Sequence, residues 1–233
     1  MNIAANILRL QESISETLIR TGRTDEVTLI AVTKTHPVEV MEEALRAGIK
    51  HIGENKVQEA RKKLPLLTVP YDSFHFIGHL QSNKINQLLD LKPTLIHSVH
   101  SLELAKRLHY ALGRTNRTQD ILIQINSSDE MSKSGFSFSE AAESIIRIAA
   151  LSTLHIKGLM TIGMLGEKEI SRPLFAKMKC LFEELKSLEI PGVEMKYLSM
   201  GMSDDYTIAL EEGSNLLRIG TAIFGERNYG AGE

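Results

Sequence analysis

Residues 28–34 read Thr-Leu-Ile-Ala-Val-Thr-Lys, and this stretch sets the pattern for the chain. Its centre is apolar without polar alternation, which is typical of a parallel strand covered on both faces. Similar short runs recur at residues 28–32, 51–53, 74–77, 95–99, 121–125, 156–160, 197–200 and 216–219. They number about eight, as a (β/α)8 barrel requires.

Helical patterns occupy the segments between these runs. They cover residues 37–47, 55–64, 82–89, 102–112, 139–151, 172–185 and 204–211, and a further one at 3–20 precedes the first run. Ser101, Ser139 and Ser203 are expected to cap helices, and Gly48 and Gly213 suit helix ends. The pattern predicts an α/β fold, a single (β/α)8 TIM barrel with an extra N-terminal helix. The barrel is expected to span residues 1–225, followed by a short C-terminal tail at 226–233.

A doubly wound open sheet is the alternative fold, but no Gly-x-Gly-x-x-Gly follows the first run. Of the 233 residues, 42% are hydrophobic and 24% charged, an ordinary globular balance, and the formal net charge is -2. This charge gives no reason to expect nucleic acid as a partner. No apolar run approaches the roughly 20 residues of a membrane span, and no signal peptide is apparent, so we expect a cytoplasmic protein. Cys180 is the one cysteine of the sequence, so no internal disulfide can form, and we expect its side chain to be buried.

The candidate site lies where the strands end, because parallel barrels build their sites at the C-terminal ends of the strands. Lys34 ends the first run. A lysine there is either solvated at the rim or desolvated inside, and a desolvated amine becomes a nucleophile toward an aldehyde. The residues alone leave both possibilities open.

Two further segments at this rim suit a phosphate group, because loops after strands 7 and 8 form the usual phosphate site of this fold. Ser203 either adds a hydroxyl to that site or only caps a helix. Gly220 and Thr221 would offer a close backbone approach and N–H and hydroxyl donors. Arg218 needs a partner in its apolar run, either a carboxylate or a ligand. Asp204 and the next residue suit a helix start better than a metal site, and no metal ligand set is expected.

Several longer motifs appear in order along the chain. They are Ile30-Ala31-Val32-Thr33-Lys34-Thr35, Gly53-Glu54-Asn55-Lys56-Val57, Phe76-Ile77-Gly78-His79-Leu80-Gln81-Ser82, Lys133-Ser134-Gly135, Gly158-Leu159-Met160, Leu198-Ser199-Met200-Gly201-Met202-Ser203-Asp204 and Arg218-Ile219-Gly220-Thr221. Together they resemble the YggS/PROSC family of pyridoxal phosphate homeostasis proteins, whose barrel is that of the alanine racemase N-terminal domain. The resemblance runs from about Leu29 to Gly225.

The resemblance implies a cofactor and a role for each site residue. Lys34 matches the lysine that holds pyridoxal 5'-phosphate as a covalent aldimine, and Arg218 matches the arginine that faces the pyridine nitrogen. Ser203, Gly220 and Thr221 match the phosphate site, and Asn55 and Met160 match positions that line the cofactor. The roles of His36, His79 and Lys133 stay open.

The resemblance also implies that the protein carries pyridoxal phosphate rather than catalysing a reaction with it. Alanine racemases have a C-terminal β domain that supplies a catalytic tyrosine, whereas this sequence ends eight residues after Gly225. We therefore expect an open site with little or no turnover, in a monomer that buffers pyridoxal phosphate and delivers it to apo enzymes that depend on it. The alternatives are a low-activity amino-acid racemase and a barrel that binds another phosphorylated metabolite.

Overall fold

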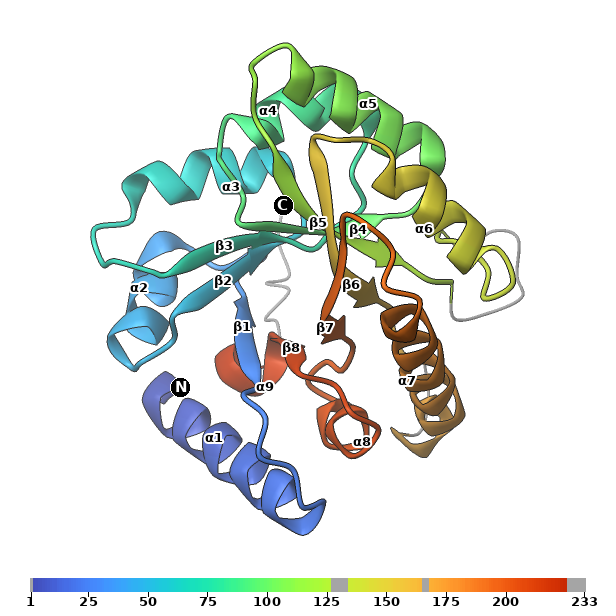
Figure 1. Ribbon diagram of the computed structural model, residues 1–233. Coiled ribbons are helices and arrows are strands. Elements are labelled where there is room, and N and C mark those ends of the chain that lie inside the picture. The colour runs from blue at the N-terminus through green and yellow to red at the C-terminus, as the bar shows by residue number, and fades with distance from the viewer. Residues whose placement is uncertain (1, 127–133, 165–167, 226–233) are drawn as a thin grey trace.

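The computed structural model describes residues 2–126, 134–164 and 168–225, and these form a closed barrel of eight parallel strands (Figure 1). The strands follow each other round the barrel in chain order, and β8 pairs with β1. They are β1 (Thr28–Val32), β2 (His51–Glu54), β3 (Ser73–Phe76), β4 (Leu95–Val99), β5 (Gln119–Gln124), β6 (Leu154–Met160), β7 (Val193–Ser199) and β8 (Leu216–Ile219). The predicted TIM barrel is confirmed, and each predicted run overlaps one strand.

Helices cover the outside of the barrel (Figure 1). They are α1 (Ile3–Arg20), α2 (Val38–Arg46), α3 (Val57–Lys63), α4 (Ile85–Leu89), α5 (Leu102–Gly113), α6 (Ala141–Ala149), α7 (Arg172–Ser187), α8 (Tyr206–Glu211) and α9 (Thr221–Phe224). Short 3-10 turns add residues 64–66, 82–84 and 168–171. Each of these helices was predicted from the sequence except α9, whose four residues are too few to show a helical period.

The extra N-terminal helix is confirmed, and it completes the helical layer. The apolar stripe of α1 is buried at Ile3, Ile7, Leu10 and Ile14. Helix α1 lies against α2, α8 and α9, and Asn6 Nδ2 donates to the Ile223 carbonyl at 2.9 Å. The apolar stripe of α1 is therefore part of the core between the strands and the helices.

Two apolar clusters are separated by the sheet. The larger one lies between the strands and the surrounding helices. The smaller one fills part of the barrel interior and contains Ile30, Leu95, Leu122, Met160 and Leu216. Most apolar burial therefore lies outside the barrel, and the interior has room for polar side chains.

Two local expectations are wrong. Helix α6 begins at Ala141 and Ser139 does not cap it; the Ser137 hydroxyl instead accepts a hydrogen bond from the Glu140 N–H. Cys180 is exposed, because it lies on the outer face of α7. Ser101 does cap α5, accepting from the Leu104 N–H at 3.2 Å.

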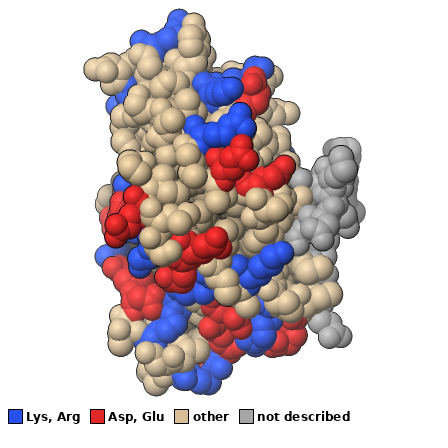
Figure 2. All heavy atoms as spheres, turned by 45° about the vertical axis from the view of Figure 1, so that its right-hand side comes forward, with Lys and Arg blue, Asp and Glu red and all other residues tan. Residues whose placement is uncertain are grey.

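Acidic and basic side chains are interspersed on the face shown in Figure 2, in keeping with the small net charge. Among the described residues, no helix has the length and apolar character that crossing a membrane requires.

Candidate functional site

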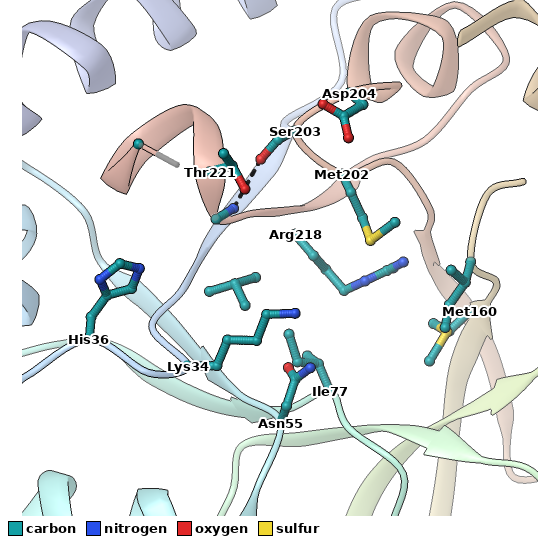
Figure 3. Close-up of a pocket in the computed structure, with 14 residues that line it drawn as sticks. Lys34, His36, Asn55, Ile77, Met160, Met202, Ser203, Asp204, Arg218 and Thr221 are labelled. Atoms are coloured by element: carbon teal, nitrogen blue, oxygen red, sulfur yellow. Dashed lines mark hydrogen bonds between the residues drawn. The ribbon is translucent and has the colours of Figure 1, made fainter. Parts of the chain in front are cut away.

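Lys34 lies in a tight turn directly after β1. The His36 N–H donates to the Thr33 carbonyl at 3.1 Å, and Thr35 adopts a left-handed backbone conformation with φ of 67°. Glu59 holds this turn from α3 by accepting from the Thr35 N–H at 2.8 Å. The turn directs the half-buried Lys34 side chain into a cavity at the C-terminal rim (Figure 3).

A buried ion pair supports the same turn from behind. Lys63 on α3 places Nζ 2.5 Å from Oε1 of Glu54, which is fully buried, and donates to the Thr33 carbonyl at 2.9 Å. The Thr33 hydroxyl donates to the same Glu54 oxygen at 2.6 Å. Burial raises the pKa of Glu54, against the opposite effect of Lys63 and Thr33. Although Glu54 ends β2 beside the rim, its contacts show that it faces α3.

The loops after β7 and β8 meet at Ser203. Its hydroxyl oxygen accepts a hydrogen bond from the backbone N–H group of Gly220 at 3.3 Å (Figure 3). The same oxygen accepts from the N–H group of Ala222 at 3.0 Å. The expectation that Ser203 caps the helix after β7 is wrong, because α8 begins only at Tyr206. The serine is joined instead to the start of α9, beside Thr221. A hydroxyl and two backbone N–H groups are thus gathered at one point of the rim.

Arg218 projects from β8 across the cavity toward Met160 on β6 (Figure 3). Only 4% of its surface is exposed, and burial lowers its pKa to about 10. Its Nη1 donates to the Ser199 hydroxyl at 2.6 Å and its Nη2 to the Thr161 carbonyl at 2.8 Å. Within the part of the chain that the structure describes, no carboxylate forms an ion pair with it. Of the two partners that the sequence allows for Arg218, a carboxylate or a ligand, no carboxylate of a described residue is present.

The cavity itself has a volume of about 190 Å³. All seven predicted site residues line it: Lys34, Asn55, Met160, Ser203, Arg218, Gly220 and Thr221. The Oδ1 atom of Asn55 is buried and has no hydrogen-bond partner among the described residues, so it is an acceptor that a ligand can satisfy. A second cavity of about 610 Å³ lies beside the first and shares Ile77, Met160 and Met202 with it.

Two histidines of open role lie at these cavities. The His36 ring packs on Phe224 with ring centroids 4.5 Å apart, and the His79 ring stacks on His100 at 4.3 Å. Lys133 lies outside the described residues. Of the described His, Cys, Asp and Glu side chains, no group of three or more is arranged to hold a metal ion.

Comparison with known proteins places this barrel in a family. The model of the alanine racemase N-terminal domain matches residues 2–228. Pyridoxal phosphate homeostasis proteins of Escherichia coli and Aquifex aeolicus are 40% and 38% identical to the chain over 234 and 231 residues. The matches cover 98% of this chain in both cases, and 98% and 100% of those proteins. The chain therefore belongs to the alanine racemase N-terminal domain family and groups with the proteins named pyridoxal phosphate homeostasis protein.

A solved structure agrees with this assignment. PipY of Synechococcus elongatus, described with PLP bound, is 36% identical to this chain. The match has a TM-score of 0.78 and covers 91% of this chain and 100% of that one. The resemblance inferred from the sequence motifs is confirmed.

Proposed function

We propose that this protein binds pyridoxal 5'-phosphate in the rim cavity and serves in the homeostasis of that cofactor, holding it and releasing it. The observation that carries the proposal is the meeting of Lys34 and Arg218 in one cavity with the donors gathered at Ser203. The cofactor has an aldehyde, a pyridine nitrogen and a phosphate, and each needs a different protein group. The cavity offers one candidate for each.

We assign the covalent contact to Lys34, whose amine would hold the aldehyde carbon as a Schiff base. The phosphate would lie at Ser203, Gly220 and Thr221, where hydroxyl and backbone N–H donors meet. The backbone N–H groups of Gly220 and Ala222 both donate to the Ser203 hydroxyl oxygen, so these donors converge on one place. Converging donors favour anion binding because the backbone already has the orientation that a phosphate needs.

Arg218 would face the pyridine nitrogen, while Asn55 and Met160 would line the ring. A guanidinium is always charged, so it favours the unprotonated nitrogen and weakens the ring as an electron sink. The unpaired Asn55 Oδ1 suits a donor group on the ring. This environment favours holding the cofactor over rapid amino-acid chemistry, in agreement with the names of the relatives.

The proposal includes the working form of the protein: a cytoplasmic monomer with residues 1–225 as the cofactor-binding unit, passing pyridoxal phosphate to apo enzymes that need it. Loaded protein mixed with such an apo enzyme should restore the activity of that enzyme. Gel filtration should give the mass of one chain. Recovery no faster than with an equal amount of free cofactor would contradict delivery, although not binding.

Borohydride reduction of the loaded protein, followed by peptide mass mapping, tests the site. We expect the reduced adduct on Lys34, its loss in Lys34→Ala, and its retention in the control Lys56→Ala, which removes an exposed lysine near the rim. A label on another residue would overturn the assignment. Absence of both adduct and cofactor absorbance would favour another phosphorylated ligand. Turnover of single L-amino acids well above that of free cofactor, lost in Lys34→Ala, would favour the racemase.

A further inference from the structure

A chain of polar side chains runs through the barrel interior, where branched apolar residues usually pack. Each of its members is hydrogen-bonded to the next: His51, Ser73, His75, His97, Ser199 and Arg218, hereafter the histidine chain. Nδ1 of His51 lies 2.7 Å from Oγ of Ser73, and the same Oγ lies 2.7 Å from Nε2 of His75. Nδ1 of His75 lies 2.9 Å from Nε2 of His97, and Nδ1 of His97 lies 3.0 Å from Oγ of Ser199. Arg218 completes the histidine chain at 2.6 Å.

The histidine chain crosses the barrel from one end to the other. It starts at the half-buried His51, the first residue of β2, and reaches Ser199, the last residue of β7. His97 on β4 makes the crossing to β7, and it is fully buried, as is Ser199. The chain therefore links the N-terminal mouth to the cavity wall, where Arg218 lies.

Arg218 sets the direction of the hydrogen bonds at its end. A guanidinium only donates, so the Ser199 oxygen accepts from Nη1. Among the described residues, the other hydrogen-bond partner of the Ser199 hydroxyl is Nδ1 of His97. The buried hydroxyl proton can be satisfied only if it is donated to that nitrogen. His97 must then carry its own proton on Nε2.

The same assignment of donors and acceptors continues along the histidine chain toward His51. Nε2 of His97 donates to Nδ1 of His75, whose Nε2 then donates to Ser73, and the Ser73 hydroxyl donates to Nδ1 of His51. Burial lowers the pKa of His75 to about 3 and holds the pKa of His97 well below its usual range. The His75 and His97 rings are therefore neutral near pH 7, and this order of hydrogen bonds gives all three rings the Nε2–H form.

The orientation of Arg218 depends on this order. Among the described residues its guanidinium has two hydrogen-bond partners, the Ser199 hydroxyl and the Thr161 carbonyl, and the carbonyl cannot change its role. The Ser199 hydroxyl can rotate, and if its proton turned toward the guanidinium the contact would become repulsive. An acceptor at Nδ1 of His97 prevents that rotation.

We propose that His97 is a positioning residue of the cofactor site: by accepting the Ser199 proton it holds that hydroxyl as an acceptor, which fixes Arg218 toward the cavity. The role of Arg218 toward the pyridine nitrogen rests on the proposed function, whereas the order of the hydrogen bonds does not. Two experiments therefore separate the two claims.

The first experiment needs no cofactor. Long-range ¹⁵N–¹H NMR spectra of the histidine rings distinguish the two neutral forms from the charged one. We expect Nε2–H forms for His75 and His97, with Nδ1 unprotonated. In Arg218→Met, which removes the donor but keeps an unbranched side chain, we expect the His97 signals to change. An Nδ1–H or charged His97 in the unmodified protein would overturn the proposal, whether or not the protein binds pyridoxal phosphate.

The second experiment uses the loaded protein. In His97→Leu we expect pyridoxal phosphate affinity to fall about ten-fold, the size expected when a hydrogen bond that orients a charged group is lost. The pH profile of cofactor absorbance should shift as well. His97→Asn retains a carbonyl near the Nδ1 position and should stay within about two-fold of the unmodified protein.

His109→Gln is the control, because His109 bonds Thr153 outside the histidine chain at 2.8 Å. Borohydride labelling of Lys34 in every variant would show that the proposed function stands. If His97→Leu is folded and labelled but keeps the affinity and pH profile, the positioning role is wrong. If Lys34 is not labelled in the unmodified protein, the proposed function fails and the NMR result still decides the order of the chain.

Discussion

Replacement of Lys63 by Met tests whether the buried ion pair holds the turn that carries Lys34. The Lys63 ammonium lies 2.5 Å from the carboxylate of Glu54, which is fully buried. At that separation and an effective dielectric constant of about 20, the Coulomb attraction is about 7 kcal/mol before desolvation is subtracted. Removal of one partner from a buried pair costs about 3–5 kcal/mol, because the other charge stays buried. We expect Lys63→Met to lower the free energy of unfolding by that amount at neutral pH.

The free energy of unfolding that Lys63→Met loses should depend on pH. Burial raises the pKa of Glu54 while Lys63 lowers it, so the variant should raise this pKa further. A carboxyl group with a higher pKa in the folded state contributes stability that is complete below its unfolded pKa and lost as pH rises through the folded pKa. The variant should therefore recover part of its stability as the pH falls from about 7 to about 5.

Urea unfolding followed by circular dichroism at both pH values measures these effects. Lys62→Met is the matched control, because Lys62 lies one residue earlier on α3 and is exposed. It should change stability by less than about 0.5 kcal/mol. If Lys63→Met loses less than about 1 kcal/mol near pH 7, or loses the same amount at both pH values, the charge-burial argument is refuted.

Glycine substitutions give further tests, read by thermal unfolding. In Gly158→Ala the new Cβ would lie 1.9 Å from the Tyr197 carbonyl oxygen at a φ of 140°, so we expect a loss above about 4 kcal/mol or insoluble protein. Gly113→Ala, at the end of α5 with open space around it, should gain about 0.5–1 kcal/mol; a loss there would contradict the helix assignment. Gly220→Ala meets Val32 only at 3.6 Å, so stability should change by less than about 1 kcal/mol while pyridoxal phosphate affinity falls. Unchanged affinity would reject its assigned place beside the phosphate.

Most of the fold could be predicted because its signals are local. A parallel strand covered on both faces reads as a short apolar run, so all eight strands were visible in the sequence. Helix α9 was missed because four residues show no period. The partners of Ser203 were missed for another reason: they lie 17 and 19 residues later in the sequence, and no local pattern reports them.

Lys34, Ser203, Arg218, Gly220 and Thr221 could be predicted because one rule gathers the C-terminal ends of parallel strands at one rim. Asn55 and Met160 were predicted from the family resemblance. No comparable rule predicts the polar contacts of the histidine chain inside the barrel or those of Glu54 outside it. Gly53 and His75 are paired across β2 and β3, and His51 is paired with Ser73, but strand register cannot be read from an isolated sequence. The direction of the Glu54 side chain depends on the same register. A search for polar residues at inward positions of neighbouring strands would have found the histidine chain.

The division of the apolar core into two clusters explains how the barrel tolerates the buried histidine chain. Buried polar groups are costly unless each is hydrogen-bonded, and the histidine chain satisfies its members in one order. The larger apolar cluster lies outside the sheet, between strands and helices, so stability depends mainly on contacts that the interior does not share. Polar residues inside the barrel therefore cost little stability, and they can fix Arg218 in the cavity wall. It follows that substitutions at His97 should affect the position of Arg218 more than they affect the outer packing.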